Sequence, residues 1–182
     1  MSAIKSNILR RMDLEHPGVR ICCIRFIERV VQTQTPGLIS DPRRPELNEA
    51  SLALVPSDHA ILSPKNLEAE AHGLLDRALG VLQENHRYLT TWHMQNHGSA
   101  NRDSDALLVT ATLNGLGGLM RTRATVANRI LNAVLTFNPF KLANSPLTPA
   151  AKMMIRSMEK TVVVFLQHIL KRFETMLLNC IS

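Results

Sequence analysis

Apolar residues recur every three or four positions in six segments of the chain, and polar residues fill the positions between them. This period is typical of amphipathic helices with one buried face. The predicted helices cover residues 2–12, 18–34, 67–85, 105–122, 123–137 and 149–178. No segment shows the sustained alternation and hairpin turns of a β-sheet, so the pattern predicts an all-α fold.

The segment 18–34 has a predicted apolar face and a predicted charged face. The apolar stripe consists of Val19, Cys23, Phe26 and Val30, widened by Cys22 and Ile27. The opposite side holds Ile21, Arg25, Glu28 and Gln32. Pro17 fits the first turn of this helix, and Thr35-Pro36-Gly37 ends the pattern.

The later helices have equally regular predicted cores. Their apolar stripes consist of Leu74, Leu75, Ala78, Leu79 and Leu82; of Leu108, Leu113, Leu116 and Leu119; and of Val126, Ile130, Val134 and Phe137. In the last helix, Pro149 fits the first helical position, because the N–H that proline lacks is not used in the first turn. Thr148 precedes it and fits the N-cap.

The connection 35–66 is unusually long and contains five prolines, which exclude a continuous helix. Its apolar residues predict that much of it packs against the helices; they are Leu47, Leu52, Leu54, Val55, Ile61 and Leu62. The connection 86–104 is rich in His, Asn and Ser and is predicted to be a mobile tip, whereas 138–148 is predicted to be a short turn.

The six helices fall into three pairs, 2–12 with 18–34, 67–85 with 105–122, and 123–137 with 149–178. Antiparallel pairs in series predict a HEAT/armadillo-like α-solenoid, which would form one domain over residues 1–182 with the long proline-rich loop 35–66 inside it. Internal sequence identity is too weak to demonstrate a repeat, so a helical bundle is the alternative.

Composition supports a folded chain with basic ends. Apolar residues make up 45% of the sequence and charged residues 20%, as in globular proteins. No apolar run is long enough for a membrane span, and three cysteines, two of them adjacent, fit a reducing compartment better than a disulfide framework. The net charge of +6 divides into +4 over residues 1–45, −5 over 46–105 and +7 over 106–182, which favours an acidic partner.

The sequence gives little support for a metal site or an enzyme. Cys22 and Cys23 point about 100° apart on a helix, so we interpret them as small core residues and not as chelating ligands. His93 and His97 have helical ligand spacing but no acidic third ligand nearby. No nucleophile motif or carboxylate pair is visible, so no catalytic residue and no cofactor is predicted.

Three glycines interrupt the helix predicted over 105–122, in the stretch Asn114-Gly115-Leu116-Gly117-Gly118. A phosphate-binding loop would need a Gly-Lys-Ser/Thr ending and a preceding strand, and the chain has neither here. We therefore predict that these glycines let another helix approach closely.

Paired basic residues are the remaining candidates for function. Arg25 and Arg29 lie one turn apart, as do Arg156 and Lys160 on the last helix. Arginine binds carboxylate and phosphate through its planar fork, so these residues suit either a protein or a nucleic acid, although a solvated face is the simplest interpretation of any single one. Stacking aromatics for RNA are scarce, with Tyr88 and Trp92 both near the acidic segment.

Four stretches resemble a known family. They read "GVRICCIRFIERVV", "DPRRPELNEASLALVPSDH", "LNGLGGLMRTRATVANRILNAV" and "MIRSMEKTVVVFLQHILKR". Together they cover most of the chain from Gly18 to Arg172, and they resemble the N-terminal HEAT region of the symplekin family, the scaffold of the mRNA cleavage and polyadenylation machinery.

The resemblance implies a non-catalytic nuclear scaffold that binds an RNA polymerase II C-terminal-domain phosphatase and raises its activity, alongside other cleavage and polyadenylation factor subunits. It also implies that this chain is a segment of a longer protein, and that the second helix of each pair lines the partner-binding concave face. The partner-binding residues that the resemblance implies are Ile21, Arg25, Glu28 and Arg29. Asn114, Arg121, Arg156 and Lys160 are further candidates by their helix positions alone. The alternative is a basic helical-repeat module that binds RNA directly with the same residues.

Overall fold

The computed structural model describes residues 2–14, 16–39, 43, 48–83, 102–142 and 149–181. The α-helices of these ranges are α1 (Ser2–Leu14), α2 (Pro17–Gln34), α3 (Pro64–Gln83), α5 (Arg102–Thr122), α6 (Ala124–Thr136) and α7 (Pro149–Ile181). Two short 3₁₀ helices are η2 (Leu52–Leu54) and η3 (Pro139–Leu142). All six predicted helices are confirmed, with ends that differ from the predicted ends by at most three residues.

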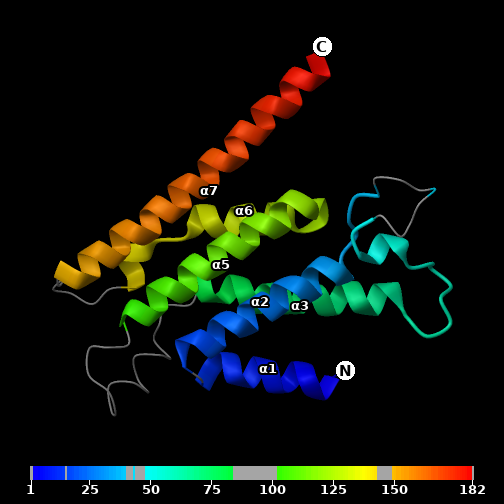
Figure 1. Cartoon of the computed structure of the whole chain (residues 1–182), viewed down its shortest axis with the longest axis horizontal. Coiled ribbons are helices and arrows are strands. Elements are labelled where there is room, and N and C mark those ends of the chain that lie inside the picture. Colours follow the sequence, from blue (N-terminus) through cyan, green and yellow to red (C-terminus); the bar gives the residue numbers. More distant parts are fainter. Residues whose placement is uncertain are drawn as a thin grey trace.

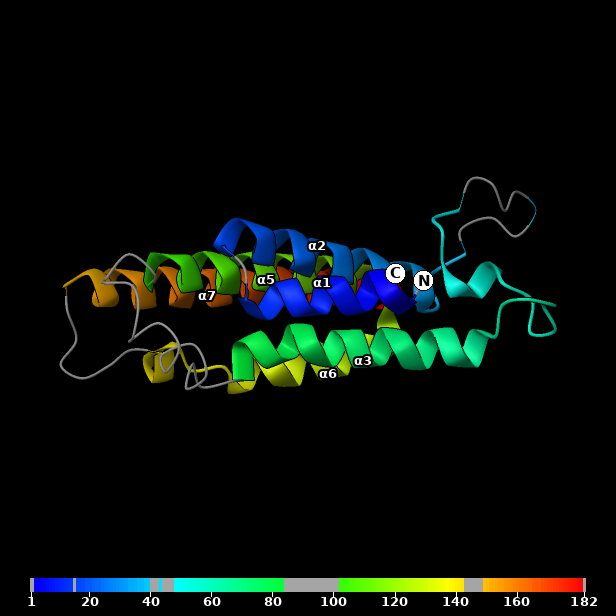
Figure 2. The ribbon, with the colours of Figure 1, turned by 90° about the horizontal axis from the view of Figure 1, so that it is seen from below.

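Successive helices run antiparallel, α5 packs beside both α2 and α7, and α3 packs beside α6. Figure 1 shows α2, α5 and α7 running in one direction, while α1, α3 and α6 run in the other. In Figure 2, α2, α5 and α7 lie along one side of the molecule and α3 and α6 along the other. The described residues contain no strand, so the prediction of an all-α, HEAT-like solenoid is confirmed.

A single hydrophobic core runs between the two layers. Its most deeply buried large apolar side chains come from α2, α3, α5 and α6, and they are Ile24, Ile27, Val31, Leu75, Leu108, Val109, Leu113, Leu116, Val126, Ile130 and Val134. The predicted stripes of α3 and α5 are buried at every position. Burial of a leucine or isoleucine side chain stabilises a fold by about 1.5–3 kcal/mol, so these stripes hold neighbouring pairs together.

The ends of α2 and the start of α7 lie at the residues that the sequence predicts. The His16 Nδ1 accepts a hydrogen bond from the Gly18 N–H over 3.2 Å, and Pro17 occupies the first turn of α2. The helix ends at Gln34, where the buried Thr35 hydroxyl donates to the Val31 carbonyl oxygen over 2.6 Å. Pro149 is the first residue of α7, as predicted, and Thr148 lies outside the described residues.

Two predictions about burial are wrong. Cys22 is exposed, and the buried stripe of α2 includes Ile24 and Val31, because this helix packs against α1, α3 and α5 at once. In the loop, Leu52 is buried as predicted, but the Ile61 side chain is 89% exposed and Leu62 is also exposed. Leu47 lies outside the described residues, as do residues 86–101 of the predicted mobile tip.

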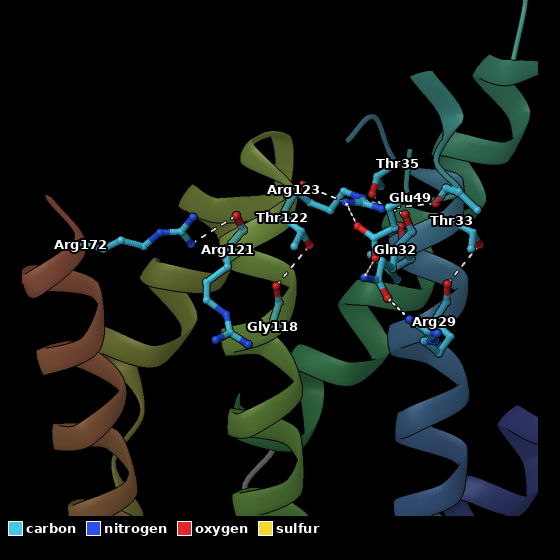
Figure 3. A network of polar contacts seen from close by, with 12 residues as sticks. Arg29, Gln32, Thr33, Thr35, Glu49, Gly118, Arg121, Thr122, Arg123 and Arg172 are labelled. Atoms are coloured by element: carbon cyan, nitrogen blue, oxygen red, sulfur yellow. Dashed lines mark hydrogen bonds and ion pairs between the residues drawn. The ribbon is translucent and has the colours of Figure 1, made fainter. Parts of the chain in front are cut away.

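Arg123 joins the turn between α5 and α6 to the end of α2 and to the loop that follows α2 (Figure 3). Its Nε donates to the Gln32 carbonyl oxygen over 2.7 Å, and its Nη1 donates to the Glu49 carboxylate over 3.2 Å. A third bond reaches the Ala50 carbonyl oxygen over 3.4 Å. The Arg123 side chain is only 1% exposed, and a Cβ at Gly37 would lie 2.8 Å from its Nη1. Arg123 therefore fixes the start and the middle of the loop to the helix ends.

Candidate partner-binding face

Six of the eight predicted partner-binding residues are exposed on α2, α5 and α7, the second helices of the three predicted pairs. They are Arg25, Arg29, Asn114, Arg121, Arg156 and Lys160. The helices that carry them are neighbours, because α5 packs against both α2 and α7. We call this set the basic face.

The layer of α2, α5 and α7 is more basic than the opposite one. These three helices carry ten Lys/Arg against five Asp/Glu, whereas α1, α3 and α6 together carry six against four, and only α3 has an acidic excess. The sequence could not tell whether the acidic and basic segments lie on opposite sides. The structure places the acidic α3 in one layer and most of the basic helical residues in the other, so the basic face suits an anionic partner.

The prediction that Glu28 and Ile21 lie on the side of α2 opposite the apolar stripe, away from the core, is wrong. Glu28 is 9% exposed, and Ile21 is partly buried against the core. A Cβ on Gly115 of α5 would lie 2.5 Å from the Glu28 Oε2 and closer still to Oε1. Glycine at position 115 therefore makes the room for this carboxylate between the helices.

Arg25 lies above the buried carboxylate. Its Nη1 donates to the Glu28 Oε2 over 3.1 Å, and 56% of the Arg25 side chain is exposed. Burial raises the pKa of Glu28, and the nearby Arg25 charge and its hydrogen bond partly oppose that rise. The Glu28 Oε1 is buried and has no hydrogen-bond partner among the described residues. Glu28 therefore holds the exposed Arg25 side chain through a hydrogen bond from a buried position.

Arg29 is connected to the Arg123 network. Its Nη1 donates to the Gln32 side-chain oxygen over 2.7 Å, and the Gln32 amide nitrogen bonds the Glu49 carboxylate. Figure 3 shows Arg29, Arg121 and Arg172 on α2, α5 and α7, respectively. The loop that Arg123 holds thus also limits the conformations of Arg29.

A groove of about 1030 Å³ lies along α5 and α7, which pack against each other, and residues 36–38 and the start of α6 also line it. Three residues of the basic face line it, namely Asn114, Arg121 and Lys160, whereas Arg25, Arg29 and Arg156 lie outside it. Its floor includes Leu113, Gly117, Met120, Phe165 and Ile169. A Cβ on Gly117 would lie 3.2 Å from the Phe165 ring, so the prediction that glycines permit close packing is confirmed at positions 115 and 117.

Sequence reasoning missed Arg172, which also lines the groove. Its Nη1 donates to the Arg121 carbonyl oxygen over 3.3 Å. A spacing of four residues along α7 could have identified it, because Lys160, Val164, His168 and Arg172 follow one another at i, i+4, i+8 and i+12. All four line the groove.

The described residues offer binding chemistry and no assembled metal site. No three His, Cys, Asp or Glu side chains gather there to hold an ion. His93 and His97 fall in the range that the structure does not describe, and Cys23 is buried while Cys22 is exposed. No helix in the described ranges is both long and apolar enough to cross a membrane.

Layered helix pairs with a basic face define a HEAT-like helical-repeat protein. The chain belongs to the Symplekin/PTA1 N-terminal family, whose model matches residues 1–180. One relative is the mRNA cleavage and polyadenylation specificity factor complex subunit pta1 of Schizosaccharomyces pombe, which is 28% identical over 172 residues. That match covers 94% of this chain and 23% of the relative, so the chain spans about a quarter of the relative's length. The resemblance seen in the sequence is confirmed.

Proposed function

We propose that this chain is a non-catalytic scaffold segment of the nuclear machinery that cleaves and polyadenylates pre-mRNA. On this proposal it binds an RNA polymerase II C-terminal-domain phosphatase and stimulates it. The observation that carries the proposal is the basic face, because six exposed residues of the three second helices occupy one layer. Family membership and the complex named for the fission yeast relative support the choice of pathway.

Arg25 is the central contact of the proposed interface. It is exposed, and its Glu28 partner holds it toward the surface from a buried position. A planar guanidinium that is already oriented binds a carboxylate bidentately and loses little side-chain entropy in doing so. Arginine residues of this kind often dominate the energy of a protein interface.

Stimulation follows from differential binding. A rigid face that binds the active conformation of the phosphatase more tightly than its inactive conformation shifts the population toward the active one. No group of the scaffold needs to enter the reaction. The buried core between the layers and the loop fixed by Arg123 supply the rigidity that this mechanism needs.

RNA is the second candidate, since the excess of positive charge on α2, α5 and α7 also suits phosphates. Binding to RNA weakens steeply with salt through counterion release and falls by similar amounts when any one of the arginines is removed. A protein interface depends instead on a few central residues, and Arg25 should be one of them.

A pull-down from ribonuclease-treated nuclear extract tests the proposal. The baits are the wild-type chain, Arg25→Ala, and Lys65→Ala as a control from α3 in the opposite layer. We expect the wild type and Lys65→Ala to recover the polymerase phosphatase and cleavage factors, and Arg25→Ala to lose the phosphatase. Equal recovery by all three baits would contradict the proposed interface. Recovery of RNA alone from untreated extract would favour the second candidate.

A further inference from the structure

The groove between α5 and α7 has the length of a short helix. Its α5 wall runs from Thr110 to Thr122 and its α7 wall from Ser157 to Arg172. At a rise of 1.5 Å per residue, these walls are about 18 and 22 Å long. A helix of about 12–15 residues has the same length.

The groove has an apolar lining that is partly exposed. Phe165 and Leu113 are buried in its floor, whereas the Val164 side chain is 62% exposed at its wall. At one end lies Leu38, whose side chain is 80% exposed. Apolar side chains that remain in water around a concave site are a recurring sign of a protein-binding surface.

Positive charge surrounds this apolar lining. Arg121, Lys160 and Arg172 line the groove, and its lining contains no aspartate or glutamate. Within the described part of the chain, Lys160 forms no ion pair. A bound segment that carries carboxylates would meet three cations in the groove, and no carboxylate of the groove would repel it. Charge complementarity therefore favours an acidic occupant.

The wall residues also have the spacing that a helix recognises. Ser157, Thr161, Phe165 and Ile169 follow one another every four residues along α7, as do Lys160, Val164, His168 and Arg172. Rows at i, i+4, i+8 form the ridges and grooves into which a second helix packs its own side chains. A wall row with two cations beside a floor row that contains Phe165 and Ile169 matches an amphipathic helix with acidic residues along one edge.

We propose that the groove between α5 and α7 docks an acidic amphipathic helix of about a dozen residues, supplied by a partner protein. Its apolar residues, spaced at i, i+4 and i+7, contact Val164, Phe165 and Leu38. Its carboxylates pair with Lys160, Arg121 and Arg172. The groove shares Asn114, Arg121 and Lys160 with the basic face but excludes Arg25. The inference goes beyond the proposed function, because helix docking here does not require a phosphatase.

Selection from a random 14-residue peptide library displayed on phage tests the proposal, with the wild-type chain as bait. The enriched peptides are synthesised with a fluorophore, and their affinities are measured by anisotropy. Thr161→Trp fills the groove, and its matched control Val163→Trp adds the same side chain to an exposed position of α7 outside the groove. Lys160→Glu reverses a groove charge, and its control Lys152→Glu reverses an exposed charge elsewhere on α7.

We expect enriched peptides that combine helical apolar spacing with aspartate or glutamate. Thr161→Trp and Lys160→Glu should each weaken their binding by about tenfold or more, whereas the two controls and Arg25→Ala should leave it unchanged. Circular dichroism establishes whether each variant is folded. If Thr161→Trp does not fold, the comparison of Lys160→Glu with Lys152→Glu tests the proposal.

Three results would overturn the proposal: no enrichment, enrichment of peptides without acidic residues, or equal binding to the groove variants and their controls. The groove would be assigned to RNA if no peptide were enriched, a labelled oligouridylate bound the wild-type chain, and both groove variants abolished that binding. Because Arg25→Ala should not affect the peptide, failure here is distinguishable from failure of the phosphatase interface.

Discussion

Gly115→Ala should reverse its effect on stability when Glu28 is shortened. Alanine is favoured over glycine in a helix interior by about 1 kcal/mol, so the substitution alone should stabilise α5. In this fold, however, the new Cβ would lie 2.5 Å from the Glu28 Oε2 and closer to Oε1. Optimal contact requires about 3.5 Å, so the buried carboxylate must move by more than about 1 Å.

The size of the effect follows from what that movement breaks. The Glu28 Oε2 would lose its hydrogen bond from Arg25, which is worth about 1 kcal/mol for a pair that is partly exposed to water. Forcing an extra group into a packed interface costs about 1–3 kcal/mol. After the helix gain is subtracted, Gly115→Ala should lower the unfolding free energy by about 1–3 kcal/mol, and Tm by about 5 °C for a chain of this size.

A double-mutant cycle measures the coupling between the two residues. Gly115→Ala, Glu28→Ala and the double variant are unfolded by heat and by urea, with circular dichroism as the probe. In the Glu28→Ala background, Gly115→Ala should raise the unfolding free energy by up to about 1 kcal/mol. Gly73→Ala on α3 is the matched control, because a Cβ there meets no atom within 4 Å, and it should stabilise the chain in both backgrounds.

The reasoning would be refuted if Gly115→Ala stabilised the wild-type chain as much as Gly73→Ala does. It would also be refuted if the effect of Gly115→Ala were the same with and without the Glu28 side chain, because the predicted cost arises only from that contact.

Three further predictions concern the buried polar groups and the thiols. Arg123→Met should lower the unfolding free energy by about 1–3 kcal/mol, because the Gln32 and Ala50 carbonyl oxygens lose their donor, while the exposed Arg121→Met should change it by less than about 0.5 kcal/mol. Equal melting temperatures for these two variants would contradict the network. In a Cys180→Ser background, Cys22 should react with a thiol reagent at once and Cys23 only on unfolding; two fast thiols would be inconsistent with the observed burial. The pKa of Glu28 is higher in the folded chain than its ordinary value of 4.5, so the folded state binds the proton more tightly than the unfolded state does. This tighter proton binding stabilises the fold at low pH, and that stabilisation is lost as pH rises above 4.5. The unfolding free energy of Glu28→Gln should therefore rise relative to that of the wild type as pH increases from 4.5 to neutrality. A fall of this difference with rising pH would disprove the burial argument.

The sequence predicted the helices well because each one carries its own periodic signal. The stripe from Leu74 to Leu82 and the stripe from Leu108 to Leu119 are buried as predicted, since these helices bury a face that local spacing defines. The same reasoning failed for Glu28 and Cys22 because α2 packs against three helices, and no single stripe describes such a helix.

Long-range contacts account for what the sequence could not predict. Arg123 bonds groups that precede it by 73 to 91 residues, and no local pattern distinguishes it from the exposed Arg121 two positions earlier. The groove likewise arises only when α5 and α7 lie side by side. The basic residues Arg25, Arg121 and Lys160 could be named in advance, but the groove and the buried partner of Arg25 could not.

A binding titration with purified phosphatase tests the central claim most directly. The polymerase C-terminal-domain phosphatase is titrated into the wild-type chain, into Arg25→Glu and into the control Lys65→Glu, with heat as the signal. Its turnover of a phosphorylated C-terminal-domain peptide is followed in parallel. We predict that the wild type and Lys65→Glu bind and stimulate the phosphatase equally, and that Arg25→Glu weakens binding by about 100-fold and removes the stimulation. Equal binding and equal stimulation by all three chains would contradict the account.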